Sequence, residues 1–132
     1  MKTKNALNDC GGNNRKGSQD SAGYPEGSIG ANLAKRNYVK YLIERYNRYR
    51  EADGRFGPTD RFYYSLVFKN IEAKFKAPTY FIPERRFGEL VDFLQHRVDT
   101  TILGRVKAKR GMPNYESFDE YLMRQTGTPV HA

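Results

Sequence analysis

The 132-residue sequence contains one cysteine, two histidines and no tryptophan. The single thiol, Cys10, cannot form an intramolecular disulfide, which fits a protein of a reducing compartment. With only His96 and His131 beside it, the chain has too few ligands for a structural zinc site built from Cys and His. We therefore expect no metal site and no cofactor.

Long apolar runs and catalytic motifs are also missing from the sequence. No segment approaches the ~20 apolar residues that cross a bilayer, and the first residues do not resemble a signal peptide. The sequence has no G-x-x-x-x-G-K-[ST], no H-E-x-x-H and no G-x-S-x-G motif. Asp92 and His96 stand four residues apart, but no nucleophile accompanies them, so a surface ion pair is the favoured interpretation. We expect a cytoplasmic protein that has no membrane contact and is not an enzyme.

Positive charge and aromatic carbon are abundant. Lys and Arg number 23 against 15 Asp and Glu, a formal net charge of +8. Ten Tyr and eight Phe bring the aromatic share to 14%. This aromatic content argues against a wholly disordered chain, and the length suits one domain of ordinary size.

Residues 1–30 are polar and poor in large apolar side chains. After the initial Met, only Leu7, Tyr24 and Ile29 belong to that class. Three such groups are too few to offset a backbone ordering cost of ~1–2 kcal/mol per residue. We predict a disordered N-terminal tail over 1–30, a single helical domain over 31–125 and a C-terminal tail over 126–132.

Helical periodicity begins at Asn32. Apolar residues from 32 to 52 recur at spacings of three and four, with Asn32 as the expected N-cap and a stop at Asp53-Gly54. A second helix is expected from Thr59 to Lys76. Because this second helix is apolar around most of its first half, we expect it to be the central and most buried element.

The C-terminal half of the domain contains two further expected helices. One begins after Pro83, a residue that suits the first helical turn, and ends between residues 99 and 104. Residues 105–113 are expected to form a basic loop or short strand. Ser117 and Glu120 form a capping-box pattern that begins a short last helix. The predicted fold class is all-α, a small bundle of three main helices plus a short accessory helix.

Two regions hold most of the excess positive charge. The first expected helix carries six cations against two carboxylates, and residues 105–110 carry four cations and no carboxylate. Clustered cations bind polyanions because each neutralised phosphate releases counterions. The candidate nucleic-acid contacts are Arg36, Lys40, Arg45, Arg48, Arg105, Lys107, Lys109 and Arg110. Tyr41 and Tyr49 lie among these arginines and could stack on an unpaired base if they are exposed.

Each of these features also has a plainer interpretation. A charged helix face is commonly just solvated, or it forms a protein interface, and tyrosines at helical spacing commonly lie at the edge of a core. Residues 105–110 could equally be an ordinary basic loop, although four cations in six residues repel one another unless an anion is present. Nucleic-acid binding requires the two basic regions to converge on one side of the domain.

One segment resembles a known family. Its residues are Lys74-Phe75, then Thr79-Tyr80-Phe81-Ile82-Pro83-Glu84-Arg85-Arg86-Phe87, then Leu90-Val91-Asp92-Phe93-Leu94. The pattern is similar to the C-terminal module of phage antirepressor and related phage regulatory proteins, over about residues 63–98. The resemblance implies a phage, prophage or mobile-element setting. The separate N-terminal DNA-binding domain and the tryptophan that often accompany that module are missing here, and the shared residues are scaffold by their chemistry.

These observations lead to two functional predictions. The first is a small basic nucleic-acid-binding accessory or regulatory protein of a phage, prophage or mobile element, with DNA favoured over RNA as the partner. The alternative is a protein-binding module that captures or inhibits a host or phage regulatory or nucleic-acid-handling complex through an acidic patch on that partner. The oligomeric state is left open, since the apolar second helix leaves room for a dimer seam.

Overall fold

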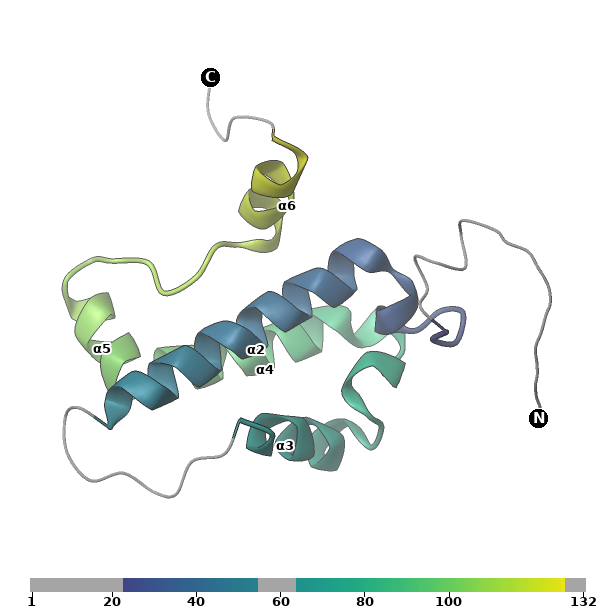
Figure 1. Cartoon of the computed structure of the whole chain (residues 1–132), viewed down its shortest axis with the longest axis horizontal. Helices are drawn as coiled ribbons and strands as arrows, with labels where there is room; N and C mark the ends of the chain where they lie inside the picture. Colours follow the sequence, from purple (N-terminus) through teal and green to yellow (C-terminus); the bar gives the residue numbers. More distant parts are fainter. Residues whose placement is uncertain (1–22, 55–63, 128–132) are drawn as a thin grey trace.

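The computed structural model describes residues 23–54 and 64–127, and these residues are mostly helical (Figure 1). The α-helices in these ranges are α2 (Leu33–Asp53), α3 (Leu66–Phe75), α4 (Phe87–Asp99), α5 (Ile102–Lys109) and α6 (Phe118–Thr126). A short 3-10 turn, η1 (Ile29–Ala31), precedes α2, and two more, η2 (Thr79–Phe81) and η3 (Glu84–Arg86), lie between α3 and α4. The described ranges contain no strand, which confirms the helical class. The count of three main helices and one accessory helix is not confirmed, because the described ranges contain five α-helices.

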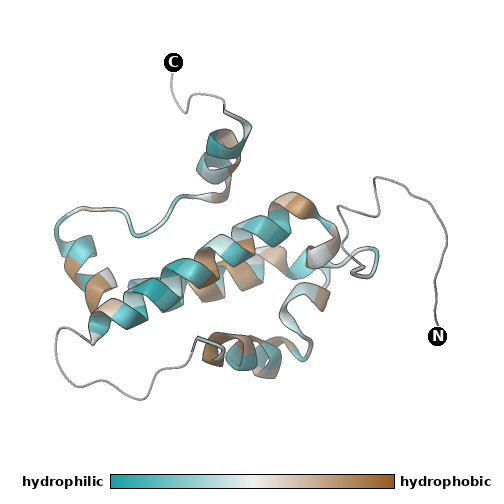
Figure 2. Ribbon diagram, viewed as in Figure 1, coloured by the Kyte–Doolittle hydropathy of each residue, from teal (hydrophilic) through white to brown (hydrophobic). Residues whose placement is uncertain are grey.

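The longest helix, α2, is the element on which α4, α5 and α6 all pack. It begins as expected at Asn32, whose side chain accepts a hydrogen bond from the Lys35 N–H at 3.0 Å. Helix α4 lies beside α2 and runs in the same direction (Figure 1). Much of α2 has hydrophilic colouring (Figure 2), although three of its core residues are tyrosines whose rings are buried.

Helix α3 is not the central element that the sequence predicted. Only Val67, Ile71 and Phe75 are buried, whereas Leu66 and Phe68 are each 38% exposed. The expected cap, Thr59, lies outside the described residues. Helix α3 lies at the edge of the bundle (Figure 1), so α2 and α4 provide the core instead.

The basic segment predicted as a loop or short strand is mostly helix α5. Its first two N–H groups, those of Ile102 and Leu103, donate to the buried carboxylate of Asp53 at 3.3 and 3.1 Å. The Thr101 hydroxyl accepts from the Gly104 N–H at 2.9 Å. The prediction was wrong although the N-cap, Thr101, is local; the Asp53 carboxylate, which accepts from the first two N–H groups, comes from the end of α2 and is remote in the sequence.

Part of the predicted N-terminal tail belongs to the core. Ile29 is fully buried, and its N–H donates to the Ile82 carbonyl at 2.8 Å. The Glu84 N–H donates in turn to the Gly27 carbonyl at 2.8 Å. The boundary at residue 30 was therefore too late, because one isoleucine is held by a distant segment. Residues 1–22 of the predicted tail lie outside the described residues.

The last helix, α6, docks on α2 through aromatic rings. The expected capping box is present, with the Glu120 N–H donating to the Ser117 hydroxyl at 3.1 Å and the Ser117 N–H donating to the Glu120 carboxylate at 2.9 Å. The ring of Tyr38 lies 5.2 Å from that of Phe118 and 5.4 Å from that of Tyr121. Helix α6 ends at residue 126, where the C-terminal tail was predicted to begin, and residues 128–132 lie outside the described part of the chain.

Candidate nucleic-acid interface

The central arginine of α2 is bound within the protein. Arg45 donates from Nε and one terminal nitrogen to the Asn114 carbonyl, at 3.0 and 2.7 Å. Its guanidinium also lies 5.4 Å from the centre of the Tyr49 ring. Arg45 thus holds the segment between α5 and α6 against α2 with its Nε and one terminal nitrogen.

Neither candidate stacking tyrosine presents a free ring. Tyr49 is 4% exposed, and its hydroxyl is within hydrogen-bond distance of the carbonyl and side-chain oxygens of Asn114, both at 3.2 Å. Tyr41 is partly buried, with its ring 5.1 Å from that of Tyr121, and its hydroxyl accepts from the Glu116 N–H at 2.7 Å. These rings belong to the packing of α2 against the C-terminal segment.

The exposed edge of α2 alternates in charge. Lys40, Glu44, Arg48 and Glu51 are all exposed and follow one another at helical spacing. The remaining candidate, Arg36, donates to the Gly30 carbonyl at 2.8 Å and lies 5.8 Å from the centre of the Tyr24 ring. The positive excess that the sequence shows on α2 therefore does not form a continuous cationic strip there.

Helix α5 differs from α2 in this respect. Arg105, Lys109 and Arg110 are exposed, and the sequence from 100 to 115 contains no carboxylate. The Lys107 ammonium is partly buried, 5.3 Å from the centre of the Tyr49 ring. We refer to these four cations as the α5 cationic face. Cations at a helix C-terminus also favour the helix dipole, typically by about 0.3–1 kcal/mol each, so part of this charge has a structural role.

The two basic regions adjoin at one point. Arg45 of α2 and Lys107 of α5 both contact the ring of Tyr49, at 5.4 and 5.3 Å from its centre. The regions thus touch at the Tyr49 ring, but only α5 contributes cations without interspersed carboxylates. In the sequence, the sign of this difference is that the first expected helix contains two glutamates, whereas residues 105–110 contain no carboxylate.

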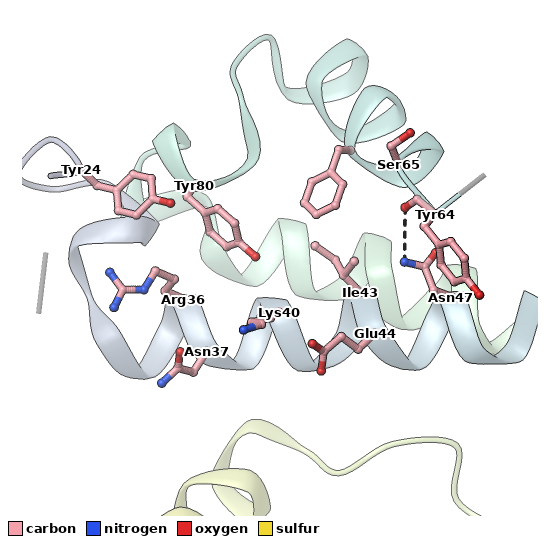
Figure 3. Close-up of a pocket in the computed structure, with 11 residues that line it drawn as sticks. Tyr24, Arg36, Asn37, Lys40, Ile43, Glu44, Asn47, Tyr64, Ser65 and Tyr80 are labelled. Atoms are coloured by element: carbon pink, nitrogen blue, oxygen red, sulfur yellow. Dashed lines mark hydrogen bonds between the residues drawn. The ribbon is translucent and has the colours of Figure 1, made fainter. Parts of the chain in front are cut away.

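A separate hollow, which the sequence analysis did not anticipate, opens between α2, α3 and η2 (Figure 3). It has a volume of about 760 Å³. We call it the aromatic groove. Its lining residues are Tyr24, Arg36, Asn37, Lys40, Ile43, Glu44, Asn47, Tyr64, Ser65, Phe68 and Tyr80. These residues come from four separate parts of the chain, so no local motif could have indicated the groove.

Two polar groups of the groove are unusual. The Asn47 side-chain oxygen is buried and has no hydrogen-bond partner, while its nitrogen donates to the Tyr64 carbonyl at 3.3 Å (Figure 3). Burial raises the pKa of the Tyr80 hydroxyl to about 12. This hydroxyl therefore keeps its proton at neutral pH and remains a hydrogen-bond donor.

Among the described residues, no group of three or more His, Cys, Asp or Glu side chains could hold a metal ion. Within 23–54 and 64–127, no helix combines the length and the apolar character that a bilayer crossing needs. The expected ion pair between Asp92 and His96 does not form, since the salt bridges between described residues join other partners.

Comparison with protein-family models, curated proteins and solved structures finds no match to this chain. The similarity to the phage antirepressor module therefore stays a prediction from the sequence. The α5 cationic face and the aromatic groove are therefore the two features of the structure that bear on function.

Proposed function

We propose that this protein binds nucleic acid through the α5 cationic face, with DNA favoured over RNA, and acts as an accessory or regulatory protein. The observation that carries the proposal is the contrast between the four cations of the α5 cationic face, which have no carboxylate among residues 100–115, and the mixed charge on α2. Arg105 and Lys109 lie four residues apart on one exposed side of α5, so both can reach one phosphate backbone. Neutralised phosphates release counterions, which supplies affinity without sequence recognition.

Several parts of the prediction rest on the sequence alone. The phage, prophage or mobile-element setting comes from the antirepressor resemblance. The cytoplasmic location, the lack of enzymatic activity and the room for a dimer seam come from composition and hydropathy. We keep them as parts of the proposal.

A fluorescence anisotropy titration with a labelled duplex tests the proposal. Affinity should fall steeply between about 50 and about 200 mM salt, with a log–log slope of about −0.9 for each phosphate contacted. Replacing Arg105 and Lys109 together by Gln should weaken binding about tenfold at low salt and reduce the slope by about two units. Absence of micromolar binding at low salt would remove the proposal.

The alternative, a protein-binding module, has one observation in its favour. Ile102 and Met112 are 40% and 47% exposed at the two ends of the α5 region. Apolar side chains beside cations suit a protein partner with an acidic patch better than they suit a phosphate backbone. Co-purification from the native host after nuclease treatment separates the two functions, since a stoichiometric protein partner that survives the nuclease favours the alternative.

A further inference from the structure

We propose that the aromatic groove binds an unpaired base of single-stranded nucleic acid, with the base against the aromatic walls and its backbone phosphate near Lys40. This inference rests on the proposed function and adds a substrate class to it. The α5 cationic face would bind duplex and single strand alike, whereas the groove would bind only a base that is not paired.

The size and walls of the groove suit a nucleotide. Its volume of about 760 Å³ lies within the range of small-molecule sites, and the rings of Tyr24, Phe68 and Tyr80 line it. Ile43, which is 3% exposed, adds an aliphatic residue from α2. Every base has a π-face, so aromatic walls bind unpaired bases with little dependence on sequence.

The Asn47 side-chain oxygen, which has no hydrogen-bond partner, indicates that the ligand carries a hydrogen-bond donor. A buried acceptor without a partner is costly, and the nitrogen of the same amide is already bonded to the Tyr64 carbonyl. Because the oxygen has almost no solvent-accessible surface, the Asn47 side chain has to turn toward the groove before a ligand N–H group can satisfy it. The exocyclic amino groups of cytosine, adenine and guanine are such donors, and an unpaired base leaves them free.

The charges at the groove favour nucleic acid over a peptide. Lys40 and Arg36 supply two cations against the one carboxylate of Glu44. Lys40 is exposed and forms no ion pair with any described residue. A phosphate attached to the bound base would meet this free ammonium, whereas an apolar peptide side chain would leave it without a partner.

A second hollow continues the groove beyond Tyr80. It has a volume of about 240 Å³, and Tyr24, Phe68 and Tyr80 line both hollows. Thr79, 4% exposed, lines the second hollow, and its hydroxyl also lacks a hydrogen-bond partner. The second hollow adds the carboxylate of Glu72 and no cation, so the aromatic groove is the one of the two that offers a cation to a backbone phosphate.

The test compares labelled oligo-dC, oligo-dT and a hairpin duplex, each titrated with the full chain. Cytosine carries an amino group where thymine carries a carbonyl, so oligo-dC should bind at least about fivefold more tightly. Asn47→Leu should remove that preference and leave duplex affinity within about twofold, because Asn47 is not part of the α5 cationic face. The substitution also removes the bond to the Tyr64 carbonyl, which is exposed and can bond to water instead. Its thermal midpoint should be unchanged or higher, since no buried polar atom is left unpaired.

Lys40→Gln provides a second variant that does not disturb the fold, because Lys40 is exposed and unpaired. It should weaken single-strand binding about fivefold more than the matched variant Lys69→Gln. Lys69 is an exposed lysine of α3 that does not line the groove. The groove proposal would be overturned if Lys40→Gln and Lys69→Gln weakened single-strand binding equally. It would also be overturned if Asn47→Leu kept the preference for dC over dT, and a peptide would then be the better candidate ligand of the groove.

The same variants distinguish a failure of the groove proposal from a failure of the proposed function. If Arg105→Gln with Lys109→Gln weakens binding to both kinds of strand while the groove variants have no effect, only the groove proposal fails. If neither strand binds at all, the proposed function fails. Cytidine monophosphate then tests the groove alone, since it should shift the NMR signals of the Asn47 side-chain amide in the wild type, and an unshifted amide overturns the inference.

Discussion

Helices α2 and α5 both appear strongly basic in the sequence, yet the structure uses their cations differently. On α2, Arg45 is bonded to the Asn114 carbonyl and Arg48 lies on an edge that also exposes Glu44 and Glu51. On α5, Arg105 and its neighbouring cations meet no carboxylate from residues 100–115. The net charge of a segment therefore overestimates the number of cations available to a ligand wherever some arginines of that segment bond to other parts of the protein.

The largest effect is expected at Asp53, because it positions α5. The carboxylate is 1% exposed, accepts two N–H bonds from α5 and lies 3.6 Å from the Arg50 guanidinium. Asp53→Ala should lower the free energy of unfolding by about 3 kcal/mol, because it leaves the part-buried N–H groups of Ile102 and Leu103 without their acceptor. Urea unfolding followed by circular dichroism measures the change. A loss below about 0.5 kcal/mol would show that α5 is held by other contacts.

The second-largest effect is expected when Arg45, which bonds within the protein, is compared with Arg105, which is exposed. Arg45→Met keeps the aliphatic stem but removes the bonds to Asn114, so the free energy of unfolding should fall by about 2 kcal/mol. Arg105→Met, the matched change on α5, should stay within about 0.5 kcal/mol, because Arg105 is exposed. Thermal and urea unfolding of the two variants would measure the difference. Equal losses would contradict the distinction between the two helices.

The stability of the protein at high pH should depend on Tyr80, a residue that lines the aromatic groove. The pKa of Tyr80 is raised to about 12 from 10.0 by burial, so the unfolded chain loses this proton at a lower pH than the folded protein does. Stability associated with Tyr80 is therefore complete below pH 10 and declines as the pH rises toward 12. Tyr80→Phe should lose less stability than the wild type between these limits, in urea unfolding measured at several pH values. Parallel curves would show that the Tyr80 hydroxyl is not desolvated.

The smallest effect is expected from the exposed arginine of α2. Arg48→Gln should change duplex affinity by less than about threefold, because neighbouring carboxylates already offset its charge. Arg105→Gln removes the same charge from α5 and should weaken binding more, in anisotropy titrations at the same low salt. A larger loss with Arg48→Gln than with Arg105→Gln would mean that α2, not α5, carries the interface.

Local signals predicted much of the fold. Helix α2 was predicted because its apolar residues recur at helical spacing and Asn32 caps it, and α6 because Ser117 and Glu120 bond to each other within one turn. Helix α5 was missed although its N-cap, Thr101, is local; the Asp53 carboxylate that binds its first two N–H groups lies about fifty residues earlier in the chain. The same holds for Ile29, whose backbone partner is Ile82. Prediction failed where a distant residue supplied the stabilising contact.

The candidate site was predicted only in part. The four cations of the α5 cationic face were named from their clustering in the sequence, which requires no knowledge of the fold. Tyr41 and Tyr49 were named as stacking candidates on the condition that they are exposed, because spacing on a helix is the same for core tyrosines and exposed ones. The aromatic groove could not be predicted, because residues as far apart as Tyr24 and Tyr80 line it.

The amino-acid sequence by itself determined the helical class, the positive charge and the ends of the helices that are capped by their own neighbours. These properties depend on composition and on interactions within one or two turns. The tertiary structure decided which arginines are engaged, which tyrosines are buried and where a groove opens. Each of those outcomes depends on which distant segments lie side by side, and local periodicity carries no information about that pairing.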